Sequence, residues 1–178
     1  QESEASRERG SLFPSVDKAL QPWFMWKQEV NQEIGLNVGL DYNAVYQTLT
    51  YSLNNHEAGG GIFRFYGDWT LVGRGSESPG SLVFKVENRH DYGQVPPQDL
   101  GFQAGYVGIT STQFSDYAWG TTNLYWKQRF NDADVSFVIG KVDPTDYLDV
   151  YELINPLTGF QNLAFSTNPA IAAPNQGL

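Results

Sequence analysis

From Gly35 onward, apolar and polar side chains alternate for about a hundred residues, a period of two. Because successive side chains of an extended chain point to opposite faces, this stretch predicts β-strands with one apolar and one polar face. Loops rich in Gly, Pro and acidic residues separate the alternating segments. Six strands are predicted, at residues 35–46, 61–73, 80–91, 101–112, 121–130 and 133–143.

The connections between these segments suit an antiparallel meander. The short "NDAD" segment between the fifth and sixth strands predicts a tight hairpin, whereas "NHEAGGG", "GRGSESPG" and "HDYGQVPPQDL" predict longer loops. The alternation is weakest over residues 101–112. The predicted fold class is therefore all-β and antiparallel, with strands paired to their neighbours in sequence.

Residues 1–34 follow another pattern. Residues 1–14 are polar with mixed charge and predict a flexible leader. Residues 15–34 have apolar side chains at helical intervals and predict a short helical segment, which we expect Pro22 to divide into two pieces. The cluster of Trp23, Phe24 and Trp26 is expected to pack in a core, with a docking surface as the alternative.

The composition narrows the classes of function. The chain has 178 residues and a formal net charge of −9, which disfavours nucleic acid as a partner. The absence of cysteine excludes disulfides, thiolate metal sites and thiol catalysis. No apolar run is long enough for a membrane-spanning helix, and a signal peptide, if the protein is exported, is expected to have been removed already.

Two architectures bury one apolar face on every strand. A soluble sandwich or barrel turns this face inward, and a membrane barrel turns it to the lipid. Aromatic residues make up 15% of the chain although the mean hydropathy is −0.40, and the predicted strands have about the 9 to 11 residues of membrane-barrel strands. These features favour the membrane barrel.

The segment "GGGIFRFYGDWTLVG", the strand "FVIGKVD" leading into "DYLD", and the order of the strands resemble the carbohydrate-selective porins of the OprB type in Gram-negative bacteria. The resemblance covers residues 35–178. It implies an up-and-down β-barrel in the outer membrane that lets sugars or similar small polar solutes diffuse passively. It implies neither an enzyme nor a cofactor, and its partners would be small sugars and outer-membrane lipid, with a homo-oligomer left open.

The strand count departs from this family. A barrel with an aqueous channel needs about 16 to 18 strands, whereas six are predicted here, or eight if "DYLDVYELI" and "FQNLAFSTN" are included. We expect the chain to be the N-terminal part of a longer porin. The alternative is a small closed barrel of eight strands whose interior is filled by side chains.

Four carboxylates recur at intervals of three in "DPTDYLDVYE". Asp143 precedes Pro144, and together with Asp146 it is expected to begin a short helix. The spacing and the lack of glycine disfavour a calcium loop. A glycosidase using Asp146 or Asp149 with Glu152 is a weaker alternative. His56 and His90 are expected to lie in loops and to be solvated.

By resemblance, residues 143–178 would form a loop that folds into the barrel and narrows it. Asp149 and Glu152 would then face polar side chains of the strands and a passing sugar. The alternative is that the charges of these strands pair with Asp41, Asp68 and Glu87 to satisfy a polar interior. A soluble carbohydrate-binding sandwich is the main rival to the porin. The predicted pore-lining residues are Arg64, Tyr66, Lys85, Arg89, Tyr125, Lys127, Arg129, Asp149 and Glu152.

Overall fold

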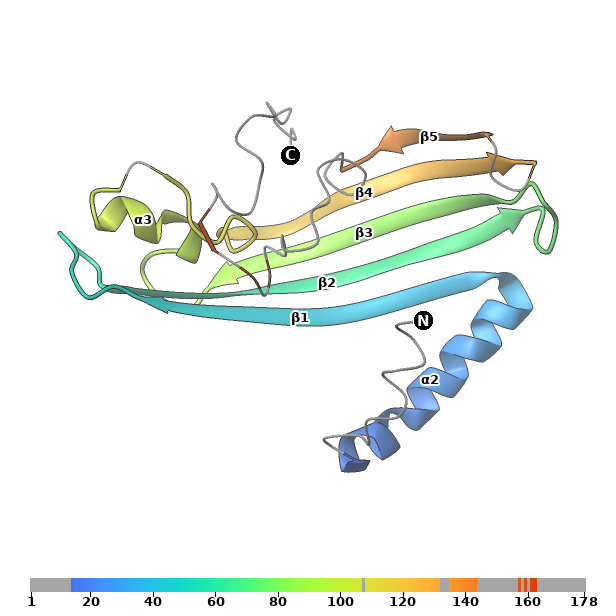
Figure 1. Cartoon of the computed structure of the whole chain (residues 1–178). Helices are drawn as coiled ribbons and strands as arrows, with labels where there is room; N and C mark the ends of the chain where they lie inside the picture. The colour runs from blue at the N-terminus through green and yellow to red at the C-terminus, as the bar shows by residue number, and fades with distance from the viewer. Residues whose placement is uncertain are drawn as a thin grey trace.

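The computed structural model describes residues 14–106, 108–131, 135–143, 157, 159 and 161–162. These residues form a helix followed by five antiparallel strands, with two short helices between the third and fourth strands (Figure 1). The elements are α2 (Pro14–Ile34), β1 (Leu36–Thr48), β2 (Glu57–Val72), β3 (Gly80–Asp91), η1 (Pro97–Asp99), α3 (Leu100–Gln103), β4 (Tyr117–Phe130) and β5 (Val135–Lys141).

The five strands form one sheet in the order β1-β2-β3-β4-β5, so each strand pairs with its neighbour in sequence. The predicted all-β antiparallel meander is confirmed at this level. Within the described residues the sheet is open, with β1 at one edge and β5 at the other, and it does not close into a barrel. Figure 1 shows long strands with a gentle common curvature.

The predicted strand at residues 101–112 is wrong. This segment belongs to the connection between β3 and β4, where it forms α3 and a series of turns. Its backbone takes positive φ values at Gly105 (78°) and Ser111 (45°), which a regular strand does not allow. Leu100 and Phe114 are buried, so the connection contributes apolar side chains to the interior of the described residues.

The N-terminal helix is a single element, contrary to the predicted division at Pro22, which lies inside α2. The prediction that Trp23, Phe24 and Trp26 pack in a core is also wrong, because all three are exposed and no residue of α2 is buried. The helix ends at Gly35, whose φ of 75° reverses the chain into β1.

Side chains from β2 and the turn after it hold the end of the helix. The indole Nε1 of Trp69 donates to the Ile34 carbonyl at 3.1 Å, and the Arg74 guanidinium donates to the Glu33 carbonyl at 2.8 Å. These bonds satisfy carbonyls that a helix terminus leaves without partners. The last turn of α2 is therefore fixed to the start of the sheet.

The connections differ at the two ends of the sheet (Figure 1). At the turn end lie α2, the β2–β3 turn at residues 73–79, the end of β4 and the start of β5. At the loop end lie the β1–β2 connection at residues 49–56 and the longer β3–β4 connection at residues 92–116.

Candidate functional site

The strand register defines two faces of the sheet. On the polar face, Asp41, Arg64 and Glu87 form one row across β1, β2 and β3. The next row toward the turn end contains Gly39, Tyr66, Lys85 and Asn123, and the row after it contains Asn37, Asp68, Val83 and Tyr125. The apolar face carries the intervening residues, among them Leu40, Phe65, Phe84 and Leu124.

In a water-soluble sheet the apolar face is buried and the polar face is exposed. The exposed fractions of the side chains in this sheet show the reverse. On β4, Asn123 and Tyr125 of the polar face are 4% and 7% exposed, whereas Leu124 of the apolar face is 50% exposed. On β1, Leu40 is 55% exposed while Asp41 is partly buried. The polar side chains are thus the sheltered ones, and many apolar side chains are open to the surroundings.

Aromatic rings cover much of the apolar face. Phe65 and Phe84 lie 5.6 Å apart between ring centroids, and Phe63 meets the edge of Trp119 at 5.9 Å. The ring of Phe84 lies over Gly67, where an added Cβ would be only 2.5 Å from it, so this position requires glycine. The face is a packed aromatic surface that the described residues leave uncovered on its outer side.

His90 also lies on this face, so its predicted position in a loop is wrong. It belongs to β3. Its ring stacks on Tyr42 with centroids 5.8 Å apart, and its Nε2 shares a hydrogen bond of 3.0 Å with the Tyr42 hydroxyl. The loop end of the apolar face therefore has aromatic rings with polar tips.

Arg64 and Asp41 form a two-pronged ion pair across β1 and β2. Arg64 Nε and one terminal nitrogen each donate to a different Asp41 oxygen at 2.8 Å. The Asn43 amide donates to the same carboxylate at 3.0 Å. Both charged side chains are about a quarter exposed, at 24% for Arg64 and 29% for Asp41. The predicted pairing of polar-face charges is confirmed here, and the pair still faces open space.

Arg89 and Glu87 form a second, more deeply buried pair on β3. The Arg89 guanidinium donates to Glu87 Oε2 at 2.6 and 3.1 Å, and it also donates to the Gln113 side-chain oxygen at 3.1 Å. Glu87 is 3% exposed and Arg89 is 17% exposed. Arg89 therefore connects the sheet to the 92–116 connection and does not line the open part of the face.

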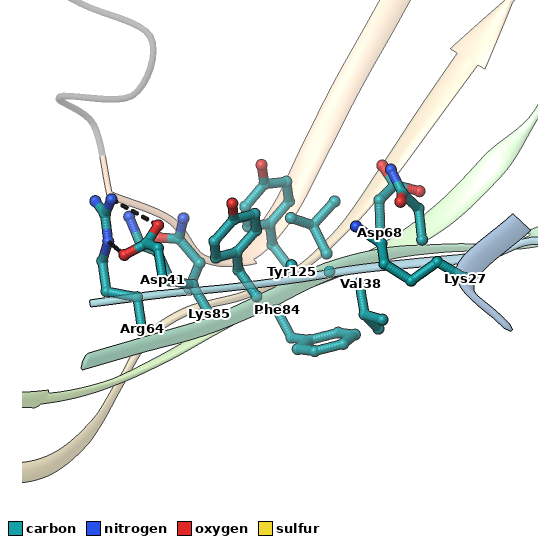
Figure 2. Close-up of a pocket in the computed structure, with 14 residues that line it drawn as sticks. Lys27, Val38, Asp41, Arg64, Asp68, Phe84, Lys85 and Tyr125 are labelled. Atoms are coloured by element: carbon teal, nitrogen blue, oxygen red, sulfur yellow. Dashed lines mark hydrogen bonds and ion pairs between the residues drawn. The ribbon is translucent and has the colours of Figure 1, made fainter. Parts of the chain in front are cut away.

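A groove of about 560 Å³ lies on the polar face, toward the turn end (Figure 2). It is lined by residues of the three polar-face rows. It brings together four predicted residues: Arg64, Tyr66, Lys85 and Tyr125. Asp41, Asp68, Asn123 and Lys27 also line it. Figure 2 shows Arg64, Asp41, Asp68 and Tyr125 on one side of the sheet and Phe84 on the other. The groove thus combines cations, carboxylates, an amide and tyrosine hydroxyls.

Glycine makes room for the groove's most exposed ring. Tyr66 is 41% exposed and lies over Gly39, where an added Cβ would approach the ring to 2.4 Å. Because Gly39 has no side chain, the Tyr66 ring can lie close to the sheet and leave the space above it open. The alternating pattern predicted Tyr66, but it gave no signal for the role of Gly39.

The structure separates the other predicted residues from this groove. Lys127 lies on the polar face opposite Ser81, nearer the turn end. Arg129 is exposed and lines a separate depression with Arg74. Asp149 and Glu152 lie outside the described residues, as does nearly all of the predicted in-folding loop at 143–178.

Another connection covers the polar face. Within the 92–116 connection, Pro97 packs close to Gly60 of β2, where an added Cβ would lie 3.0 Å from the proline ring. Ile62, also on the polar face, is fully buried. Residues 161 and 162 join this region, since Ser111 donates its amide to the Gln161 carbonyl at 2.6 Å. Part of the described cover over the polar face therefore comes from a segment that was predicted to include a strand.

Comparison with known proteins gives no relative: no family model, curated protein or solved structure matches this chain.

Among the described residues, no helix has both the length and the apolar character needed to cross a membrane.

Proposed function

We propose that this chain forms part of an outer-membrane β-barrel that lets sugars or similar small polar solutes diffuse without energy input. One observation carries the proposal: the apolar face of the sheet is exposed and the polar face is sheltered. In a barrel of this kind, apolar side chains face lipid and polar side chains face the lumen. A soluble sandwich has the opposite requirement, because its apolar faces form the core.

The strand lengths support the same proposal. β1, β2, β3 and β4 have 13, 16, 12 and 14 residues, enough to cross a hydrocarbon layer that tilted strands span with about 9 to 11. In lipid an open edge would leave backbone groups unsatisfied, at several kcal/mol each. The proposal therefore includes further strands that pair with the outer edges of β1 and β5.

The ends of the sheet suggest an orientation. Barrels of this class have short turns on the periplasmic side and longer loops outside. The 92–116 connection would then lie toward the exterior, where its inward fold narrows the entrance. The turn end, with α2 attached, would face the periplasm.

The side chains that line the groove favour a polar, uncharged solute. Arg64 is paired with Asp41, and the other charged residues of the lining, Lys27, Lys85 and Asp68, carry both signs, so the face presents hydrogen-bonding groups of both kinds without one dominant charge. A sugar needs donors and acceptors for its hydroxyls and a flat apolar surface for its ring, which the exposed ring of Tyr66 provides.

Membrane extraction and transport measurements test the proposal. The intact protein should require detergent for release from outer membranes, and vesicles that contain it should swell in iso-osmotic glucose faster than vesicles without it. Release by salt or buffer alone would instead support the soluble carbohydrate-binding sandwich. Detergent release without solute flux would support the small closed barrel.

Reversing the charge of Lys85 should change ion selectivity. Lys85 lies in the groove beside Tyr66 and Asn123, where a new carboxylate would join Asp41 and Asp68. Because charged side chains at a constriction set which ions enter, Lys85→Glu should shift the reversal potential of the channel toward cations in a salt gradient. Lys18→Glu makes the same change in α2, outside the groove, and should leave that potential unchanged. Equal shifts in both variants would contradict a lumen position for Lys85.

A further inference from the structure

A second groove, of about 500 Å³, lies at the loop end of the sheet and shares no residue with the first. It is formed by the end of β1, the start of β2 and the chain that follows β3. We call it the rim groove. Its lining residues are Tyr46, Asn54, Asn55, His56, Glu57, Ala58, Gly59, Tyr92, Gly93 and Gln94.

Two tyrosine rings flank a glycine in the rim groove. Gly59 pairs with Tyr46 across β1 and β2, and the Tyr92 amide donates to the Gly59 carbonyl at 2.8 Å. An added Cβ at Gly59 would lie 3.3 Å from the Tyr46 ring and 3.1 Å from the Tyr92 ring. The two rings therefore stand on either side of a bare backbone position that both can approach closely.

Both rings are exposed but fixed at their tips. Tyr46 is 66% exposed and its hydroxyl donates to Glu57, while Tyr92 is 55% exposed and its hydroxyl bonds to that of Tyr42. Partial burial and then the bond to Tyr42 raise the pKa of Tyr92 to about 12, so this ring stays neutral at physiological pH. Rings that are held in place before binding lose little conformational entropy when a ligand stacks on them.

The rest of the lining supplies hydrogen bonds. Asn54, Asn55 and Gln94 each offer a carbonyl oxygen and an amide, and Glu57 offers carboxylate oxygens. None of the described residues that line the rim groove is a lysine or an arginine, which disfavours a phosphate or carboxylate ligand. Aromatic rings beside amide side chains fit a ligand with many hydroxyls and an apolar ring face.

From these contacts we infer that the rim groove binds a neutral saccharide. The site is separate from the groove on the polar face, because Tyr46 and Gly59 belong to the opposite, apolar face. The saccharide can come from solution or from the headgroup of a glycolipid beside the protein. The inference holds for a barrel and for a soluble sheet alike, so it does not depend on the proposed transport.

The test uses the intact protein in detergent micelles or in phosphatidylcholine vesicles, with two probes. Maltotriose represents a soluble saccharide, and digalactosyl diacylglycerol in the vesicles represents a lipid headgroup. Saturation-transfer NMR should detect binding of one or both to the unmodified protein. Binding of maltotriose assigns a soluble ligand, and binding of the glycolipid alone assigns a headgroup.

Tyr46→Ala and Tyr92→Ala should each weaken that binding at least tenfold. Tyr46→Phe keeps the ring and removes only the bond to Glu57, so it should retain most of the binding and show that the loss is due to the ring and not to misfolding. Tyr51→Ala is the matched control. Tyr51 is a tyrosine of the β1–β2 connection that is 71% exposed, but it does not line the rim groove.

Absence of binding to both probes would overturn the inference, as would an equal loss in Tyr51→Ala. Neither result would bear on transport, which is measured by vesicle swelling. Conversely, a protein that binds maltotriose through Tyr46 and Tyr92 but carries no solute would retain the rim site and refute the porin.

Discussion

Leu40→Arg should destabilise the folded protein in phospholipid vesicles by about 2–4 kcal/mol, the cost of an arginine at the lipid face near the bilayer midplane. Leu40 is 55% exposed and pairs with Phe65, which lies midway along β2. If Leu40 instead remained exposed to water, an arginine at this position would change stability by no more than about 0.5 kcal/mol. The substitution therefore distinguishes a Leu40 side chain in lipid from one in water.

Val83→Arg is the matched control for this experiment. Val83 lies nearer the turn end than Leu40 and on the polar face, between Asp68 and Tyr125, where an arginine meets a carboxylate and water in place of lipid. Urea unfolding in vesicles, followed by tryptophan fluorescence, gives both free energies. A barrel is refuted if Leu40→Arg is as well tolerated as Val83→Arg.

Strand positions followed closely from the period of two. The predicted segment at 80–91 coincides with β3, and those at 35–46 and 121–130 differ from β1 and β4 only at their ends. The start of β2 was missed because "GGG" at residues 59–61 was assigned to a loop. In the structure these glycines belong to β2. Glycine is needed there because rings such as Tyr42 pack over the strand and leave no room for a Cβ.

The polar face was predicted in outline but not in its pairing. Alternation placed Arg64, Tyr66, Lys85 and Tyr125 on one side, and the structure brings all four into one groove. The same pattern could not separate them from Arg89, because only the fold of the 92–116 connection covers that residue. Lys27 was missed entirely, since a contact between a helix and a distant sheet leaves no periodic signal.

The direction in which each face points is a tertiary property. Alternation of apolar and polar residues is the same in a sandwich and in a membrane barrel, so alternation alone left both open, and aromatic content and strand length favoured the barrel. The burial of Asn123 beside the exposed Leu124 shows only which side of the sheet the described residues cover. The cover over Gly60 and Arg89 comes from the 92–116 connection, whose strand prediction was wrong.

Arg89→Met is expected to destabilise the protein by about 3 kcal/mol, within the range for removing one partner of a buried ion pair. The substitution keeps an unbranched apolar stem but leaves the Glu87 carboxylate, which is 3% exposed, without its two bonds from Arg89. The cost should fall at the lower end of that range, because Arg64 of β2 lies directly opposite Glu87 of β3. It should be measured by urea unfolding in the medium used for the unmodified protein.

Arg129→Met is the matched control, because Arg129 lies on the same face of the sheet but is exposed, and its loss should cost no more than about 0.5 kcal/mol. Combining Arg89→Met with Glu87→Gln should recover part of the loss, since a neutral amide is less costly to bury than a carboxylate that lacks its partner. Equal effects of the two arginine substitutions would show that Glu87 and Arg89 are solvated. In that case the 92–116 connection would not be fixed to β3 by this pair, and Gln113 would have to be held by other contacts.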